Sequence, residues 1–299
     1  ISLFKRMLPR VKETLAYYDS KPARAENGLL KYDNRFWLFE DWSNLPKETV
    51  PTFLNLWYCI GLRKVAELYR AAGKELDAEK LSEKAAKMEA LICEKLFDAS
   101  TGLFWPSLDA EMKPAGEPSV HDQTMALMLN LKPEAQKAML DKVILPFLRG
   151  EEIKGAKASA FWAAYVIAEA VRLGYGEEAI AFIKRNWEPM TSTGTTWEDY
   201  KWDERSGGSC CHAWTAHPSS SLVNLLAGIN QADVAWSKIE VKPFYAQGID
   251  HVKTLVPSPK GAIEIEWPRA NGSIKGTLKV PQGVEVKLDA GQAEITVVR

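Results

Sequence analysis

Residues 261–280 read GAIEIEWPRANGSIKGTLKV and give the clearest indication of the fold. Apolar and polar side chains alternate along this stretch, which is the period of a strand with one buried face. The Asn271-Gly272 pair at its centre favours a two-residue hairpin turn, because both residues tolerate positive φ. Similar alternation begins after about residue 232, so the sequence predicts a small antiparallel β-sandwich over residues 232–299.

Before residue 232 the apolar residues recur every three or four positions, which is the spacing of amphipathic helices. We expect eight helices, over residues 3–19, 49–72, 75–97, 121–131, 133–148, 157–173, 176–187 and 216–229. Long aromatic-rich connections follow roughly every second helix, at residues 20–46, 98–119 and 188–215. Helical hairpins with long loops on one face are typical of an α/α toroid of the six-hairpin type. Because a closed toroid of that type has twelve helices, residues 1–231 are predicted to form only part of one.

The composition excludes several classes of partner. The chain has 38 Lys and Arg against 39 Asp and Glu, which leaves a formal net charge of -1. Such a balance gives no long-range attraction to nucleic acid or to an anionic membrane. No apolar run reaches the roughly 18 residues that a membrane helix needs. We therefore expect neither a nucleic-acid partner nor a membrane-spanning segment.

The four cysteines indicate neither a disulfide framework nor a zinc site, because their spacing suits neither. Cys59 and Cys93 lie in apolar helical stretches and are predicted to be buried thiols, while Cys210 and Cys211 are adjacent in a loop. We expect no metal and no cofactor. The N-terminal residues lack the features of a signal peptide and a starting Met, so we expect a processed chain or a piece of a longer one, cytoplasmic or periplasmic.

Tryptophan is the residue type in clear excess, with 11 copies, about three times an ordinary share. Its flat, half-polar ring serves both protein cores and surfaces that stack on sugar rings. Six of the 11 lie on the three long connections, namely Trp37, Trp42, Trp105, Trp197, Trp202 and Trp214. That distribution favours a sugar-binding face over simple core filling.

The richest polar constellation is Thr193-Gly194-Thr195-Thr196-Trp197-Glu198-Asp199-Tyr200, followed by Ser209, His212, Trp214 and His217. A carboxylate beside a tryptophan can have its pKa raised by desolvation and can act as a general acid or base. The alternative is a polar surface loop in which the glutamate caps a turn. Composition alone does not separate the two interpretations.

Two further constellations are weaker. In Phe39-Glu40-Asp41-Trp42 the aspartate could simply cap a turn, and in Ser119-Val120-His121-Asp122-Gln123 the favoured role of Ser119 is to cap a helix. The sequence has no glycine-rich phosphate loop, no GxSxG elbow and no HExxH motif. Carboxylates accompanied by tryptophan and tyrosine are typical of glycosidic chemistry, in which two acids flank the bond.

These residues resemble a known family. Thr195-Thr196-Trp197-Glu198, then Ser209, His212 and Trp214, look like the C-terminal half of the α-L-rhamnosidases of glycoside hydrolase family 78. The resemblance extends over essentially the whole chain through a further set of matches, at Leu8-Pro9, Gly28-Leu29, Phe39, Asp41-Trp42, Gly228-Ile229, Ile239, Pro243 and Gly261-Ala262-Ile263.

The resemblance implies an (α/α)6 barrel followed by a β-sandwich, and hydrolysis of terminal α-L-rhamnosides with inversion. It implies that Glu198 is the general base and that His212 binds substrate beside it. It also implies that Asp41 and Trp42 line the sugar subsite. Trp37 and Trp197 are further candidates for sugar contact, so the expected ligand is a rhamnose-containing glycoside or polysaccharide.

One departure from the family pattern limits this interpretation. The family's general acid is a glutamate in an Arg/Asp/Glu-rich motif ending in Trp-x-Gly-Asp, and no such string occurs here. A missing half of the barrel or a partner chain could supply the acid, whereas Glu40 and Asp199 are less favoured substitutes. Two alternatives stay open: a degenerate member that only binds carbohydrate, and another α/α-toroid enzyme such as an unsaturated-uronyl hydrolase or a polysaccharide lyase. Lys201 and Arg205 would suit a uronate, but acidic and aromatic groups dominate that loop.

Overall fold

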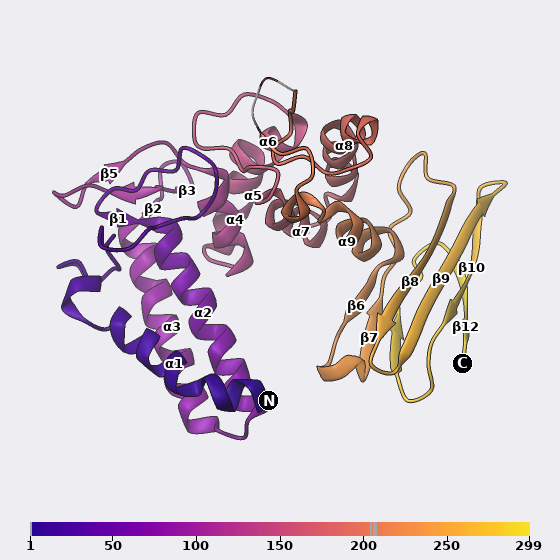
Figure 1. The fold of residues 1–299 in the computed structure, drawn as a ribbon, viewed down its shortest axis with the longest axis horizontal. Helices are drawn as coiled ribbons and strands as arrows, with labels where there is room; N and C mark the ends of the chain where they lie inside the picture. The colour runs from indigo at the N-terminus through magenta and orange to yellow at the C-terminus, as the bar shows by residue number, and fades with distance from the viewer. Residues whose placement is uncertain (1, 204, 206–207) are drawn as a thin grey trace. The chain divides into compact units, whose positions relative to one another are not determined.

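The computed structural model describes all residues except 1, 204, 206 and 207 (Figure 1). The chain divides into two compact units, Ile1–Glu169 and Ala170–Arg299, which are described separately. None of the helices in the described part of the chain is long and apolar enough to cross a membrane.

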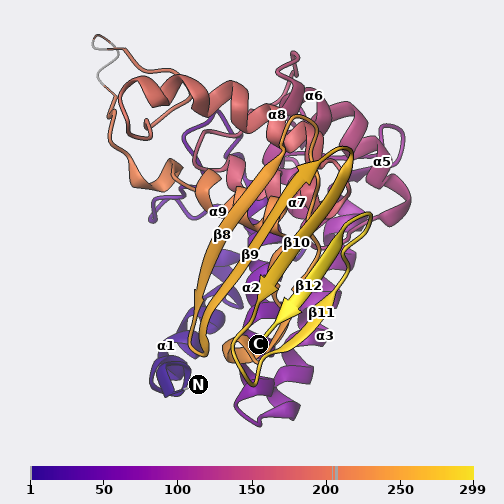
Figure 2. The ribbon, with the colours of Figure 1, turned by 90° about the vertical axis from the view of Figure 1, so that its right-hand side faces the viewer.

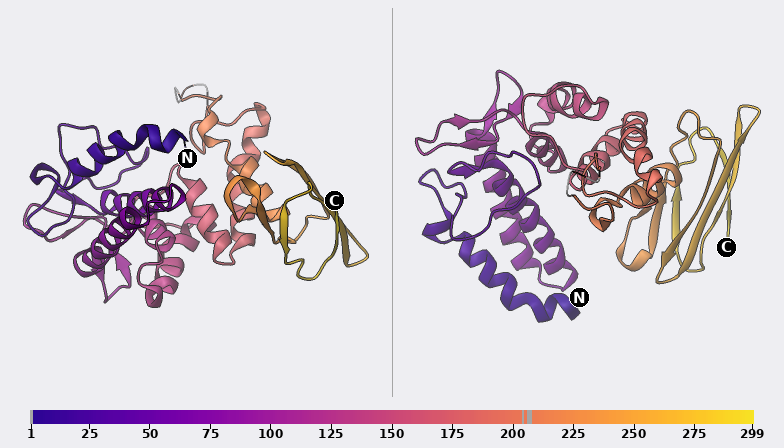
Figure 3. Two further views of the ribbon diagram at one scale, coloured as in Figure 1. Left: turned by 90° about the horizontal axis from the view of Figure 1, so that it is seen from below. Right: turned by 45° about the horizontal axis from the view of Figure 1, so that its top comes forward.

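The first unit is built on a helical hairpin. Helices α2 (Thr52–Ala71) and α3 (Glu75–Lys95) lie side by side, and the chain turns between them at Gly73, whose φ is 74° (Figure 1, Figure 3). Helix α1 (Ser2–Tyr18) contacts this pair through Phe4, which packs in one apolar cluster with Ala66, Tyr69 and Ala78. These three helices confirm the first three predicted from periodicity.

The rest of the first unit is more broken than predicted. The connection at 98–119 holds short strands: β2 (Phe97–Asp98) pairs with β3 (Leu103–Phe104), and β4 (Ser107–Leu108) lies between β1 (Val50–Pro51) and β5 (Pro114–Ala115). Helix α4 spans Val120–Met128. The helix predicted at 133–148 is interrupted, and it comprises a 3-10 turn (Pro133–Ala135), α5 (Gln136–Met139), a π-helical turn (Leu140–Ile144) and α6 (Leu145–Arg149). Helix α7 (Ala163–Arg172) begins six residues later than predicted, because residues 157–159 are irregular and residues 160–162 form a turn.

The second unit combines short helices with a β domain. Helix α8 spans Gly176–Trp187, and α9 spans Pro218–Leu222 and continues as a π-helical turn, Val223–Ala227. The strands follow as β6 (Ile229–Gln231), β7 (Lys238–Val241), β8 (His251–Ser258), β9 (Gly261–Ala270), β10 (Ser273–Lys279), β11 (Glu285–Leu288) and β12 (Glu294–Val298). The β domain thus begins with Ile229, slightly before the predicted residue 232.

The strands form two sheets over one core, which confirms the predicted sandwich. One sheet has the order β12-β10-β9-β8 (Figure 2) and the other has the order β11-β7-β6. Ile239, Val241, Ile265 and Trp267 share the buried core between them. Asn271 and Gly272 join β9 to β10 with φ values of 52° and 78°, as the hairpin prediction requires. The sheets are mixed rather than purely antiparallel, because β12 runs parallel to β10 and β11 runs parallel to β7.

Candidate active site

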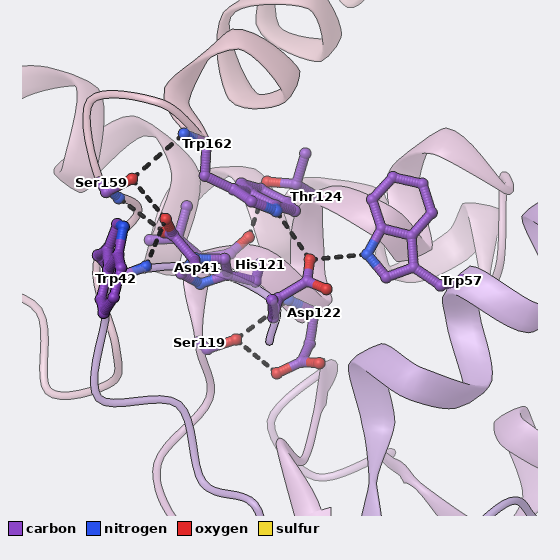
Figure 4. Close-up of polar contacts among 11 residues, drawn as sticks. Asp41, Trp42, Trp57, Ser119, His121, Asp122, Thr124, Ser159 and Trp162 are labelled. Atoms are coloured by element: carbon purple, nitrogen blue, oxygen red, sulfur yellow. Dashed lines mark hydrogen bonds and ion pairs between the residues drawn. The ribbon is translucent and has the colours of Figure 1, made fainter. Parts of the chain in front are cut away.

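The first candidate region, in the first unit, centres on the carboxylate of Asp41 (Figure 4). Its Oδ2 lies 2.7 Å from His121 Nε2 and accepts the backbone N–H of Ser159 at 2.8 Å. Its Oδ1 accepts the backbone N–H of Trp42 at 2.8 Å and the Ser159 hydroxyl. The side chains of Asp41 and His121 are fully buried. The Asp41 carboxylate therefore has hydrogen-bond partners within the protein on both oxygens, and its side chain is not exposed to solvent.

Local capping places the partners of Asp41. Ser119 caps α4, as predicted, since its Oγ accepts the backbone N–H of Asp122 at 3.0 Å. This puts His121 in the first turn of the helix, where its ring packs 4.4 Å from that of Trp162. Ser159 lies in the turn before α7, where its Oγ accepts the backbone N–H of Trp162 at 3.3 Å. Two turns at helix starts thus converge on one carboxylate.

The protonation of this pair follows from burial and hydrogen bonding. Burial alone would raise the pKa of Asp41, but the bonds from His121 and Ser159 outweigh it and lower the pKa. Burial lowers the pKa of His121 despite the attraction of Asp41. Asp41 is therefore an anion beside a neutral imidazole, whose Nε2 carries the proton that it donates to Asp41.

Glu40, next along the chain, is a carboxyl of a different kind. Its Oε1 accepts the indole N–H of Trp57 and that of Trp162, both at 2.7 Å. Burial, which the two indole bonds oppose, raises its pKa to about 7, and the charge of Asp41 adds to the shift. Tyr165 packs against both tryptophans, and its ring centroid lies 5.1 Å from that of Trp162 and 5.5 Å from that of Trp57.

A third carboxyl, Asp122, lies close enough for the charge of Glu40 to affect it. Burial is the main reason that the pKa of Asp122 is raised well above its usual range. Its Oδ2 accepts the Ser119 hydroxyl, whereas its enclosed Oδ1 has no partner among the described residues. Burial therefore favours the uncharged form of Asp122.

The exposed tryptophans of this unit lie on the same loop as Asp41. Trp42 and Trp37 are 60% and 77% exposed, and Phe39 lies between them, with ring centroids 5.2 Å and 5.0 Å away. A cavity of about 410 Å³ lies beside Trp37 and is also lined by Tyr17 and Tyr32. Both rings offer apolar faces that a sugar could stack on.

The second candidate region, in the second unit, is a clamp between residues 195–198 and 209–212. The backbone N–H of Glu198 donates to the Ser209 carbonyl, and that of His212 donates to the Thr196 carbonyl, both at 2.8 Å. The Ser209 N–H in turn donates to Glu198 Oε2 at 3.0 Å. Glu198 is half-buried, and its Oε1 has no hydrogen-bond partner among the described residues. The clamp therefore orients one carboxylate oxygen and leaves the other available.

Thr215 connects the two sides of this clamp from beneath. Its buried hydroxyl lies 2.6 Å from the carbonyl oxygen of Trp197 and 2.9 Å from that of His212. The Trp197 ring is itself buried, at 7% exposure, and its Nε1 donates to Thr193 Oγ1 at 2.8 Å. Trp197 therefore supports the clamp from inside and does not offer an open stacking face.

The predicted site residues fall into two groups. Trp37, Asp41 and Trp42 share one loop of the first unit, and Trp197, Glu198 and His212 share the clamp of the second. Sequence reasoning missed four contributors, namely Trp57, Ser159, Trp162 and Thr215. Ser159 and Trp162 form a Ser-x-x-Trp pattern before a helix, but this pattern is too common to indicate a functional site, and it does not include Trp57 or Thr215. Asp199, considered as a substitute acid, is exposed and accepts the Tyr200 N–H at 2.7 Å.

The geometry offers no cluster for a metal. Within the part of the chain that the structure describes, no three His, Cys, Asp or Glu side chains come together as a metal site. The cysteines among these residues are free thiols, with Cys59 buried, Cys93 and Cys210 half-buried and Cys211 exposed. Burial raises the pKa values of Cys59 and Cys93, so neither is a reactive thiolate at neutral pH.

Helical hairpins with buried carboxylates, followed by a β-sandwich, place the chain in the class of six-hairpin glycosidases. Residues 1–225 match the family model described as the bacterial alpha-L-rhamnosidase 6 hairpin glycosidase domain. Residues 228–297 match the model of the bacterial alpha-L-rhamnosidase C-terminal domain. The chain therefore belongs to the bacterial α-L-rhamnosidase family, as the sequence resemblance implied.

Individual relatives agree with this assignment. The chain is similar to an alpha-L-rhamnosidase of Formosa agariphila, with 29% identity over 112 residues, which are 36% of this chain and 12% of that protein. The GH78 rhamnosidase of Bacillus sp. GL1 has the same fold, with a TM-score of 0.85, 23% identity, and coverage of 98% of this chain and 32% of that one. An alpha-L-rhamnosidase of Streptomyces avermitilis, solved with L-rhamnose, gives a TM-score of 0.72 at 13% identity, covering 96% of this chain and 27% of that one. The chain thus spans about a third or less of the length of these relatives.

Proposed function

We propose that this chain serves the hydrolysis of terminal α-L-rhamnosides with inversion at the anomeric carbon, and that Glu198 is the general base. The observation that carries the proposal is the Glu198 carboxylate, whose Oε2 is held by the Ser209 N–H at 3.0 Å while Oε1 is left to contact a water molecule. The family match and the rhamnose bound in the Streptomyces avermitilis relative support the choice of sugar.

In the proposed reaction Glu198 removes a proton from a water molecule as the water oxygen bonds to the anomeric carbon. The bond from that carbon to the leaving oxygen breaks on the opposite face, and a general acid protonates the leaving oxygen. Inverting enzymes hold the two carboxyl groups roughly 6.5–9.5 Å apart, which leaves room for the water. The first product is then β-L-rhamnose.

The remaining residues take binding roles in this proposal. His212, across the clamp from Glu198, binds a ring hydroxyl of the sugar. Trp37 and Trp42, in the first unit, offer exposed apolar faces on which a sugar ring can stack. Asp41 acts indirectly, because its carboxylate is buried and holds the backbone of Trp42 at 2.8 Å. Trp197 likewise supports the clamp from within.

A second candidate function is sugar binding without turnover. The exposed rings of Trp37 and Trp42 favour it, because apolar faces stack on sugar rings whether or not catalysis follows. A general acid contributes about 10²–10⁴-fold to the rate, so a protein without one would bind rhamnose and hydrolyse little.

The test compares Glu198→Gln with the wild type in the polypeptide as its gene encodes it. Turnover of a chromogenic α-L-rhamnoside and calorimetric binding of L-rhamnose are measured on both. We expect the variant to lose about 10²-fold or more in turnover while rhamnose binding persists. Near-normal turnover in the variant would refute the base assignment. Rhamnose binding with no wild-type turnover would support the second candidate.

A further inference from the structure

Two adjacent carboxyls, Glu40 and Asp41, lie in the segment that carries the exposed Trp42, and they are not equally available to a ligand. Asp41 accepts hydrogen bonds from His121, from Trp42 and twice from Ser159, and its side chain has no exposed surface. A sugar hydroxyl would have to displace one of these bonds to reach it. Asp41 is thus closed to direct contact.

Glu40 has the opposite arrangement. The residue is only 8% exposed, and two indole N–H groups occupy its Oε1. Its Oε2, however, has no hydrogen-bond partner among the described residues and is not among the enclosed polar atoms of the chain. The side chain is therefore fixed by Trp57 and Trp162, and it presents one open acceptor at the edge of an aromatic wall.

We propose that Glu40, and not Asp41, is the carboxyl of this segment that contacts the ligand, with Oε2 accepting a hydrogen bond from a ring hydroxyl of the sugar. The choice of sugar rests on the proposed function. A fixed acceptor beside apolar rings is the usual construction of a sugar subsite, because the rings cover the C–H face of the sugar and the acceptor selects a hydroxyl. Burial raises the pKa of Glu40, which agrees with a carboxyl that has one oxygen without a donor among the described residues.

The same cluster indicates the charge of the ligand. The charge of Asp41 acts on Glu40, and that of Glu40 acts on Asp122. No lysine or arginine in the described part of the chain bonds to any of the three. The charge of Asp41 would therefore disfavour a uronate carboxylate beside Glu40, whereas the hydroxyls of a neutral sugar can donate to Glu40. The cluster therefore favours a neutral sugar over the uronyl substrate of the alternative hypothesis.

The test uses Glu40→Gln, Asp41→Asn and Glu48→Gln, with Glu48 as an exposed control on the same connection. Glutamine can keep its carbonyl oxygen toward the two indoles while it replaces Oε2 with an amide donor. Calorimetry measures the binding of methyl α-L-rhamnoside and of its 2-, 3- and 4-deoxy analogues to each variant, and thermal melting checks that each one is folded. Methyl α-D-glucuronide serves as the anionic probe.

We expect Glu40→Gln to weaken rhamnoside binding about tenfold or more, because a hydrogen bond to a charged group is lost. The loss should vanish for the one deoxy analogue that lacks the contacted hydroxyl. Asp41→Asn and Glu48→Gln should show no such hydroxyl-specific loss, and the wild type should bind the glucuronide more weakly than the rhamnoside.

Two results would overturn the assignment. One is a Glu40→Gln loss that is absent or equal for every analogue, which would leave Glu40 as a support for Trp57 and Trp162. The other is a hydroxyl-specific loss in Asp41→Asn, which remains informative even if Glu40→Gln fails to fold. A wild type that binds no rhamnoside would instead refute the proposed function itself, and the assignment of Glu40 to a sugar with it.

Discussion

Three buried carboxyls of the first unit have pKa values that are shifted differently, because burial opposes the charged form of each one and hydrogen-bond donors offset that effect to different extents. Asp41 accepts four hydrogen bonds and has a lowered pKa. Glu40 accepts two, both on Oε1, and has a pKa of about 7. Asp122 accepts only the Ser119 hydroxyl through its side chain, and burial raises its pKa well above the usual range. Donors stabilise the charged form, and burial opposes it.

This order predicts unequal effects of removing the charge. At pH 7 we expect Asp41→Asn to lower the free energy of unfolding by about 2–3 kcal/mol, because an amide donor would face donors of Ser159 or His121. Asp122→Asn should cost less than about 1 kcal/mol, because it replaces one neutral group with another. Urea denaturation of both variants measures this, and equal costs would show that the two aspartates have the same charge.

The titration of Glu40 predicts a pH dependence of stability. Its folded pKa of about 7 lies above its usual value of 4.5, so the folded chain holds this proton more tightly than the unfolded chain. Between about pH 4.5 and pH 7 its contribution to stability therefore falls as the pH rises, by roughly 3 kcal/mol in total. We expect Glu40→Gln to lose this slope, so that it gains stability relative to the wild type across the same range. Parallel stability curves for the two proteins would contradict the raised pKa.

Among the elements, the clamp that carries Glu198 depends on a single threonine. Thr215 joins the carbonyls of Trp197 and His212, one on each side of the clamp, and its own carbonyl accepts the Trp187 indole N–H at 2.8 Å. The hydroxyl thereby fixes the spacing of the proposed base and its histidine neighbour without contacting the sugar.

We expect Thr215→Val, which keeps the shape and removes the hydroxyl, to reduce kcat for a rhamnoside roughly tenfold or more, with KM changed much less. Thr215→Ser keeps the hydroxyl and should restore kcat. Steady-state kinetics of the polypeptide as its gene encodes it would measure both variants. If serine lowers kcat as much as valine does, the hydroxyl alone does not fix the clamp, and the role assigned to it is wrong.

A second element-scale prediction concerns Gly276 in β10. A Cβ at this position would lie 2.6 Å from the Glu266 carbonyl oxygen and 2.7 Å from Ile295 Cδ1, whereas a Cβ at Gly61 in α2 would meet nothing within 4 Å. Gly276→Ala should therefore destabilise the β domain by about 1–3 kcal/mol. Gly61→Ala should stabilise α2 by about 0.5–1 kcal/mol. Chemical denaturation tests the pair, and a Gly276→Ala variant as stable as the wild type would contradict the packing.

The elements that sequence reasoning predicted well are those with a long, unbroken period. Helices α1, α2, α3 and α8 and the β9–β10 hairpin lie where periodicity or Asn271-Gly272 placed them. The interruptions of the predicted helices could not be seen in the sequence. The π-helical turns at Leu140–Ile144 and Val223–Ala227 keep an apolar pattern close to that of an α-helix. The sequence also could not indicate the direction of the strands, because apolar and polar residues alternate in the same way in parallel and antiparallel sheets.

For the molecule as a whole, the family could be predicted from the sequence and the two loops could be proposed as candidate sites, but the residues that contact each candidate side chain could not be predicted. His121 and Ser159 lie 80 and 118 positions from Asp41 in the sequence. Only the fold brings them to one carboxylate, and it closes Asp41 while leaving Glu40 open. The sequence therefore singled out this loop as a candidate, but it could not indicate which of its two carboxyls has an oxygen without a hydrogen-bond partner among the described residues.

The central claim is that Glu198 is the base that activates water, and azide rescue of Glu198→Ala tests it most directly. Azide can occupy the space of the lost carboxylate and attack the anomeric carbon without a base. In the polypeptide as its gene encodes it, we predict that the variant loses about 10²-fold or more in turnover of an activated α-L-rhamnoside. Sodium azide should restore part of that turnover and yield β-L-rhamnosyl azide, identified by NMR. Retained turnover without azide, or an α-configured azide product, would contradict the account.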